Sequence, residues 1–215
     1  MPTERFYRLP EEKRRTIRNA AFHEFARVSV EKASINQIIK EAEISRGSFY
    51  TYFEDKWDVL AYIFEESQTE LKEFLYHSLE DLNGDIWKAL DVFFARVVEI
   101  CCGEERRHFI KNVLQHADMD DLFGEVRRHQ CPNYEAAGED VARWVYKHYS
   151  REVMREMSFR EFHAFFLMAI AAIAMEIRRF FDGKTLDEVR ESYRMKLRLL
   201  WQGVAPVSGS AETEK

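Results

Sequence analysis

The stretch Ser34–Lys56, SINQIIKEAEISRGSFYTYFEDK, decides how the chain is interpreted. Its first part carries apolar residues at i, i+3, i+4 and i+7, which is the spacing of one helix face. Those residues are Ile35, Ile38, Ile39 and Ala42. Ser34 and Gln37 give an S-x-x-Q pattern that predicts a capping box at the start of this helix. After a turn at Glu43 and Ile44, Ser45 can cap a following helix, so the stretch predicts a helix-turn-helix.

The second of these helices, Ser45–Phe53, has two different faces on a helical wheel. Phe49 and Phe53 share one face and are expected to point into the core. Gly47 and Thr51 lie almost opposite, flanked by Arg46 and Tyr50. A slim face with polar edges suits a helix that lies in the DNA major groove, which is about 12 Å wide.

Individual side chains on this helix can be given roles by their chemistry. Gly47 lets the backbone approach the bases, Thr51 offers a methyl or a hydroxyl, and Arg46 can bind guanine or a phosphate. Tyr50 and Tyr52 have the length to reach phosphate oxygens, as does Lys56 at the start of the next helix. For Tyr52 a place in the core is an equal alternative, and Arg46 can also be a solvated charge.

The rest of the chain favours an all-α fold. Only four prolines and eight glycines interrupt 215 residues, and alternation typical of strands is nearly absent. We expect a helix from about Pro10 whose buried stripe is Ile17, Ala20, Ala21 and Phe25. Further helices are expected at about Lys56–Asp81, Ile86–Cys102, Glu105–His116, Leu122–His129, Ala137–Ser150, Phe159–Phe181 and Leu186–Trp201, with a T-x-x-E capping box at Thr185–Glu188.

Charge and composition bound the function. The net charge is −6, yet residues 1–56 hold 11 Lys/Arg against 9 Asp/Glu, so a nucleic-acid contact is expected in this first quarter. The charged N-terminus and the short apolar run at Ala164–Met175 predict no secretory segment and no membrane span. Three cysteines without framework spacing fit a reducing compartment. We expect a cytoplasmic protein.

The residues from Ile17 to Leu60 resemble the DNA-binding domain of the TetR family of bacterial transcriptional regulators. IRNAAFHEF is followed by SINQIIKEAEISRGSFYTYFEDKWDVL, with a G-x-x-Y-x-x-F-x-x-K core from Gly47 to Lys56. The resemblance implies a homodimer on a near-palindromic double-stranded DNA operator, usually a repressor released by a small ligand. It implies DNA contacts at Ser34, Asn36, Gln37, Ser45, Arg46, Gly47, Ser48, Tyr50, Thr51, Tyr52 and Lys56. Glu43 and Ser29 stand where the family generally has glycine, and a left-handed conformation there would cost about 1 kcal/mol.

We expect three parts: a helix-turn-helix domain (1–55), a helical domain (56–204) to which the resemblance assigns effector binding and dimerisation, and a tail (205–215) whose composition predicts disorder. Residues 159–201 would form the dimer interface, where Ala164, Ala169, Ala171, Ala172 and Ala174 allow close helix approach. Aromatic residues with polar tips permit a moderately hydrophobic effector of unknown identity. These candidate pocket residues are Tyr62, Trp87, His108, His116, Tyr134, Trp144, Tyr149 and His163.

The sequence also carries residues that are typical of other classes of function. Glu105 and His108 form an E-x-x-H pair, but a di-iron bundle needs a second pair, which the sequence lacks. A metal sensor using His129 and Cys131, with Cys101 or Cys102, remains an alternative, as does a regulator that acts through protein contacts. The usual nucleophile-elbow, phosphate-loop and zincin motifs are absent. We therefore expect no enzyme activity, no cofactor and no bound metal.

Overall fold

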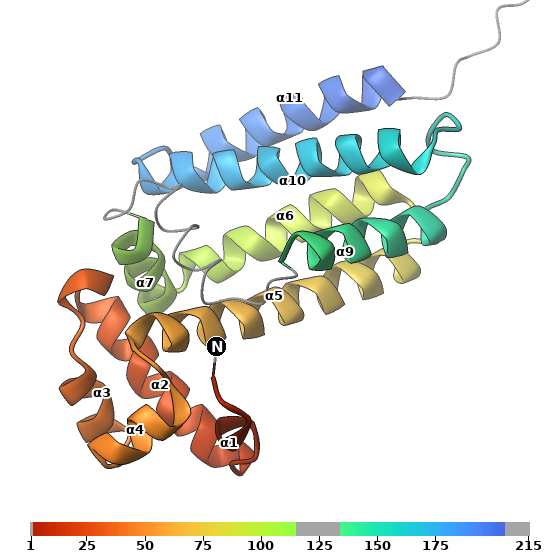
Figure 1. Ribbon diagram of the computed structural model, residues 1–215. Helices are drawn as coiled ribbons and strands as arrows, with labels where there is room; N and C mark the ends of the chain where they lie inside the picture. Colours follow the sequence, from red (N-terminus) through yellow and green to blue (C-terminus); the bar gives the residue numbers. More distant parts are fainter. Residues whose placement is uncertain (1, 115–133, 205–215) are drawn as a thin grey trace, which may run out of the picture. The chain divides into compact units, whose positions relative to one another are not determined.

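The computed structural model describes residues 2–114 and 134–204, with side chains over 2–113 and 138–203, and these residues form helices and connecting turns (Figure 1). The described chain packs as two compact units. The first comprises residues up to Leu71 together with the segment that starts at Glu99, and the second comprises Lys72–Val98 and the residues from Gly138 onward. The expected helix Leu122–His129 and the expected tail 205–215 lie outside the described residues.

The first unit begins with helices α1 (Glu4–Tyr7) and α2 (Glu11–Arg27), a single 3₁₀ turn η1 (Val30–Lys32), α3 (Ile35–Glu41) and α4 (Arg46–Tyr52). It also includes the first part of α5 (Lys56–Asp81), the end of α6 (Ile86–Cys102) and α7 (Glu104–Leu114). Helix α1 was not predicted. The predicted helices over residues 10–56 are confirmed, although Pro10 caps α2 and does not belong to it.

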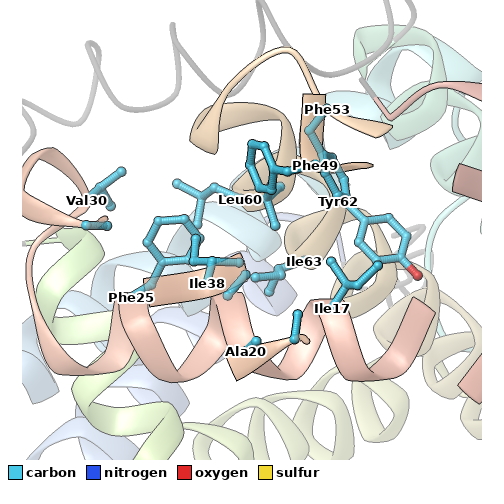
Figure 2. Close-up of a cluster of buried hydrophobic side chains, with 14 of the residues drawn as sticks. Ile17, Ala20, Phe25, Val30, Ile38, Phe49, Phe53, Leu60, Tyr62 and Ile63 are labelled. Atoms are coloured by element: carbon cyan, nitrogen blue, oxygen red, sulfur yellow. The ribbon is translucent and has the colours of Figure 1, made fainter. Parts of the chain in front are cut away.

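The core of the first unit lies between α2, α3, α4 and α5 (Figure 2). The predicted stripe of α2 is buried, and it meets Ile38 from α3 and Leu60 from α5, both without exposed surface. Phe49 and Phe53 point from α4 and the residue after it into the same cluster, as predicted. Burying apolar surface contributes about 25 cal/mol per Å², so the two buried rings stabilise the position of α4. A helix of seven residues would not be stable in water without this packing.

The turn between α3 and α4 is a Schellman motif. The N–H of Ile44 donates to the carbonyl of Ile39 at 3.0 Å, and the N–H of Glu43 donates to that of Lys40 at 3.4 Å. Glu43 has φ 51° and therefore occupies the left-handed position that usually belongs to glycine. Ser29, in contrast, has φ −61° and needs no glycine.

The capping box predicted at Ser34 and Gln37 is wrong, because the Ser34 side chain makes no capping hydrogen bond. A buried carboxylate from α2 acts there instead. Glu24 Oε1 accepts from the backbone N–H of Ser34 at 2.8 Å, and Glu24 Oε2 accepts from the Arg27 guanidinium at 2.7 and 3.0 Å. This contact ties the start of α3 to the end of α2.

Helix α7 packs against α2 in the first unit, although we expected it in the C-terminal domain. Phe109 stacks on Phe22 with ring centroids 4.8 Å apart, and Asn112 Nδ2 donates to the carbonyls of Phe25 and Ala26 at 3.1 and 2.7 Å. The amide thus satisfies carbonyls in the last turn of α2. The packing divides the helical chain after Leu71 and before Glu99. These compact units are not the functional domains that the sequence predicts, so the boundary between residues 55 and 56 stays a prediction.

The second unit contains the end of α5, most of α6, α9 (Tyr134–His148), α10 (Phe159–Phe181) and α11 (Leu186–Val204). Helices α10 and α11 lie side by side (Figure 1). The predicted capping box at Thr185 and Glu188 is confirmed, with the N–H of Thr185 donating to Glu188 at 2.8 Å and the N–H of Glu188 donating to Thr185 Oγ1 at 3.2 Å. The Thr185 N–H, followed by the Lys184 ammonium and the Thr185 hydroxyl, donates to the Glu188 carboxylate and lowers its pKa to about 2.

Helix α10 is apolar on two faces, and only one of them is covered within the described chain. Phe162, Phe165 and Phe166 point into the second unit, together with Ala169 and Ala172. The other face is exposed and carries Ala164, Leu167, Met168, Ala171, Ala174 and Met175, and α11 adds the exposed Met195 and Leu199. We call these eight residues the outer apolar face. Within the described ranges, no helix is both long and apolar enough to cross a membrane.

Candidate nucleic-acid interface

Helix α4 presents a polar face to solvent because its other face is anchored in the core. The predicted cap at Ser45 is confirmed, since Ser45 Oγ accepts from the N–H of Ser48 at 3.0 Å. Phe49 is completely buried, while Arg46, Gly47 and Tyr50 are exposed and Thr51 is half-buried. A Cβ added at Gly47 would meet only Ser45 Oγ at 3.8 Å, so the glycine leaves open space in front of the helix.

A hollow of about 400 Å³ lies beside α4, between the start of α3 and the start of α5. It brings together five of the predicted contact residues, namely Ser34, Asn36, Arg46, Tyr50 and Lys56. Ala33, Ile35, Asp55 and Trp57 complete its lining. The hollow therefore joins both helices of the predicted motif to the residue expected to bind phosphate.

Arg46 links the two helices of the motif. Its guanidinium donates to Asn36 Oδ1 at 2.9 Å and to the Tyr50 hydroxyl at 3.4 Å, and it lies 5.5 Å from the centre of the Tyr50 ring. An arginine carries five N–H donors in a fixed fork, so donors remain for a base or a phosphate. These contacts limit the positions that Arg46 can take before it meets DNA.

Lys56 is held against backbone carbonyls of η1 and of the residue that follows it. Its ammonium donates to the carbonyl of Glu31 at 2.6 Å and to that of Ala33 at 3.4 Å. Asp55 Oδ1 accepts from the N–H groups of Trp57 and Asp58 at 2.8 and 3.1 Å, which caps α5 beside it. A lysine ammonium has three donors, so Lys56 can keep both carbonyls and still meet an anion.

The remaining predicted contact residues have different surroundings. The Thr51 hydroxyl donates to the carbonyl of Gly47 at 2.9 Å, and the Ser45 and Ser48 hydroxyls lie 2.8 Å apart. Gln37 is exposed on α3. Tyr52 is half-buried, packs against the core and lies with its ring centroid 6.1 Å from that of Phe6. These contacts favour a place in the core for Tyr52 over a role in phosphate binding.

Within each unit, the described residues predicted to bind the effector have separate surroundings. In the first unit, Tyr62 is buried and its hydroxyl donates to Glu66 at 2.5 Å; burial, together with that bond, raises the pKa of Tyr62 far above its ordinary value. His108 is exposed on α7, beside a separate hollow of about 610 Å³ that Glu105 also lines. His116 and the side chain of Tyr134 lie outside the described residues.

In the second unit, the predicted effector residues contact different neighbours. Trp144 stacks on Tyr76 and His148, each with ring centroids 3.9 Å apart, and His163 stacks on Phe159 at 5.8 Å. Tyr149 is buried and stacks on Phe162 at 5.0 Å. Trp87 Nε1 donates to the carbonyl of Val153 at 3.1 Å, and Trp87 lines a crevice of about 500 Å³ together with Trp201 and Arg198.

The metal alternative gains no support from the part of the chain that can be described. Across residues 2–113 and 138–203, no group of three or more metal-binding side chains comes together. Burial, and secondarily the neighbouring Cys102, raises the pKa of Cys101 to about 12, which keeps it a neutral thiol. His129 and Cys131 lie outside the described residues.

Two family models match this chain. The model of bacterial regulatory proteins of the TetR family covers residues 17–63, and the model of the C-terminal domain of tetracycline repressor-like proteins covers residues 85–204. A curated relative, the HTH-type transcriptional regulator AcrR from Shigella flexneri, is 29% identical over 106 residues. That match spans 49% of each chain, about half the length of the relative.

Solved structures show the same fold. A TetR-family regulator from Pectobacterium atrosepticum superposes with a TM-score of 0.65 at 21% identity, covering 91% of this chain and 95% of that one. SmeT, the repressor of the SmeDEF multidrug efflux pump of Stenotrophomonas maltophilia, gives 0.64 at 16% identity over 98% of both chains. NalD, a secondary repressor of the MexAB-OprM pump in Pseudomonas aeruginosa, gives 0.61 at 18% identity over 92% of this chain and 98% of its own. Because the two family models match residues 17–63 and 85–204, the chain belongs to the TetR family of bacterial transcriptional regulators.

Proposed function

We propose that this protein is a repressor that binds a near-palindromic operator as a homodimer and releases it when a small effector binds. The observation that carries the proposal is the exposed polar face of α4, in which Arg46, Gly47 and Tyr50 face solvent while Phe49 anchors the helix. The relative AcrR, described as a transcriptional regulator, supports the same role.

Base reading is assigned to Arg46, Asn36 and Thr51. Arg46 can donate to guanine O6 and N7, and Asn36 can pair with adenine once DNA replaces its bond to Arg46. The Thr51 hydroxyl already donates to the carbonyl of Gly47, so toward DNA it acts as an acceptor, for adenine N6 or cytosine N4. Its methyl can contact thymine.

Phosphate binding is assigned to the side chains around the reading face. Lys56 and Tyr50 border the hollow beside α4, and Ser34 lies across it. Gln37, Ser45 and Ser48 are proposed to add contacts on either side. These groups position the helix without selecting a sequence.

Dimerisation is assigned to the outer apolar face of α10 and α11. Leu167, Met168, Met175, Met195 and Leu199 are each between 52% and 61% exposed in the single chain. Soluble proteins seldom leave so many large apolar side chains together in water. A second copy of the same face would bury them around a two-fold axis, as a symmetric dimer requires.

The effector is proposed to be a moderately hydrophobic molecule that prefers one separation of the two reading heads. A ligand shifts such an equilibrium only by its different affinity for the two states. A panel of aromatic compounds added to the protein–operator complex would identify it through release of labelled DNA.

The DNA-binding proposal is tested by selecting bound fragments from a random pool and measuring their affinity by fluorescence anisotropy. We expect a two-fold symmetric site, and with about six to eight phosphates contacted the slope of log affinity against log salt should be roughly −5 to −7. A scrambled fragment of equal length is the control. Equal affinity for both fragments, or binding that ignores salt, would contradict the proposal.

A further inference from the structure

At the C-terminus of α4, the Phe53 N–H donates to the Phe49 carbonyl at 2.9 Å, and the chain then leaves the helix. Its seven residues are followed by Phe53 in an extended conformation, with φ −134° and ψ 142°. The last carbonyls of a helix lack partners within it, and short helices are marginal in water. The carbonyls of Thr51 and Tyr52 therefore need donors from elsewhere in the chain.

Both of these carbonyls are bound by Thr3. The Thr3 N–H donates to the carbonyl of Tyr52 at 2.9 Å, and the Thr3 hydroxyl donates to that of Thr51 at 2.9 Å. Thr3 stands at the N-cap of α1, yet its side chain makes no capping bond to that helix. The hydroxyl that would ordinarily cap α1 is used to hold α4.

Phe6 fixes this contact from the side of the core. Its ring is completely buried, with centroids 4.7 Å from Phe53, 4.9 Å from Tyr62 and 6.1 Å from Tyr52. Tyr7 adds a hydrogen bond of 3.2 Å from its hydroxyl to Glu65 on α5. Helix α1 thus lies against α4 and is held to α5, the helix that follows the recognition motif.

We propose that the N-terminal segment Thr3–Tyr7 is a positioning element for DNA reading, which sets the last turn of α4, and that Thr3 and Phe6 are its positioning residues. The proposal rests on the proposed function, because it assigns these residues to operator binding. Thr51, the central acceptor of the reading face, lies in the turn that Thr3 holds. Loss of this contact would leave the residues that touch DNA in place but let their turn fray.

The decisive variant is Thr3→Val, which keeps the shape of the side chain and removes its donor. We expect operator affinity to fall three- to tenfold and amide hydrogen exchange at Tyr50–Phe53 in the free protein to become faster. Thr3→Ser keeps the hydroxyl and should restore both properties to the wild-type values. Thr16→Val is the matched control, because the Thr16 hydroxyl bonds only to the carbonyl of Glu12 in its own helix.

The salt dependence separates positioning from direct contact with DNA. A positioning element does not itself contact phosphates, so the slope of log affinity against log salt should be the same for Thr3→Val and the wild type. A slope shallower by about 1 would mean that the segment itself binds phosphate, and this would overturn the proposal. So would unchanged affinity and unchanged exchange in Thr3→Val.

A second variant and a second readout keep the test independent of folding and of the proposed function. Phe6→Leu retains an apolar side chain but loses the ring contacts, and it should accelerate exchange in α4 more than in α2. Equal acceleration across the first unit would show a general loss of stability and would overturn the positioning role. If the wild-type protein binds no DNA, the proposed function fails, whereas the exchange data still decide whether Thr3 and Phe6 hold α4.

Discussion

The reading face of α4 and the outer apolar face of α10 and α11 are both exposed in the single chain, but their chemistry is opposite. The first presents Arg46, Gly47 and Tyr50, and water can solvate these groups until DNA arrives. The second presents Leu167 and Met168 among other large apolar groups, whose exposure costs about 25 cal/mol per Å². A polar face is stable in water when its partner is absent, whereas an apolar face is stabilised by a partner that stays bound. The proposed operator contact is therefore reversible and the proposed dimer permanent.

The largest expected effect follows from charging the outer apolar face. Leu167→Glu would place one carboxylate from each protomer in the apolar interface of the proposed dimer, so we expect monomers in sedimentation analysis. Operator affinity should then fall by about two orders of magnitude, because each reading head would bind alone. Gln68→Glu adds the same charge at an exposed site of α5 and should change neither property. A monomeric wild-type protein would break the comparison.

The next effect separates sequence reading from phosphate binding on the reading face. Arg46→Ala should cost roughly 1–3 kcal/mol on the preferred operator and flatten the preference at one base pair. Lys56→Ala should weaken all sequences alike and make the salt slope shallower by about 1. Binding across a randomised site measures both changes, with Thr51→Ala and Asn36→Ala expected to behave like Arg46→Ala. Identical profiles for the Arg46 and Lys56 variants would contradict this division of roles.

A smaller effect is expected at two Schellman turns, one between α3 and α4 and the other between α10 and α11. Glu43→Gly should raise the free energy of unfolding by about 1 kcal/mol, since glycine adopts the left-handed conformation without strain. Gly183, at the matching position between α10 and α11, has φ 100° and open space around it, so Gly183→Ala should lower stability by about 1 kcal/mol. Chemical denaturation measures both.

Glu43→Gln is the control for charge in that experiment. It keeps the strained conformation and removes the carboxylate, so its stability should stay near that of the wild type. Both substitutions remove a negative charge from the turn before α4, so DNA affinity should rise by the same factor in Glu43→Gln and Glu43→Gly. If the glutamine variant were as stable as the glycine variant, strain would not be the cause.

The smallest expected effect on stability is at Gly47. Gly47→Ala should stabilise the fold by about 0.5–1 kcal/mol, since alanine is the better helix former and its Cβ fits. The same methyl would stand between the helix backbone and the bases, so operator affinity should fall. Thermal unfolding measures the expected gain in stability, and fluorescence anisotropy measures the expected loss of operator affinity. A variant that is stabilised and binds DNA normally would show that Gly47 does not approach the bases.

The local pattern of the sequence predicts those parts of the fold that depend on a single segment. The spacing of Ile35, Ile38 and Ala42 determines which face of α3 is buried, and Ser45 caps α4 through a residue three positions away. In the predicted Ser34–Gln37 box, Glu24, which is remote in sequence, accepts from the Ser34 N–H that the Gln37 side chain was expected to bind, and the Gln37 N–H donates to the Ser34 carbonyl instead of the Ser34 hydroxyl. Periodicity within one segment cannot reveal such a competitor.

Contacts between distant segments explain the other differences. Helix α1 has only four residues, so it is defined by its packing on α4 and not by its own periodicity. A possible signal was present in the sequence, since Thr3 precedes Glu4 and the apolar Phe6 in the manner of a helix start. The effector residues were chosen by type alone, and residue type does not determine which of them share a cavity.

The left-handed residue in the helix-turn-helix also bears on laboratory evolution of this protein. Glutamate codons become glycine codons by one nucleotide change, so random mutagenesis samples Glu43→Gly often. Selection for heat tolerance should recover that substitution early, since stabilising changes of this size are readily found. Asn83, which also has a positive φ, needs two nucleotide changes to become glycine and should be recovered much more rarely.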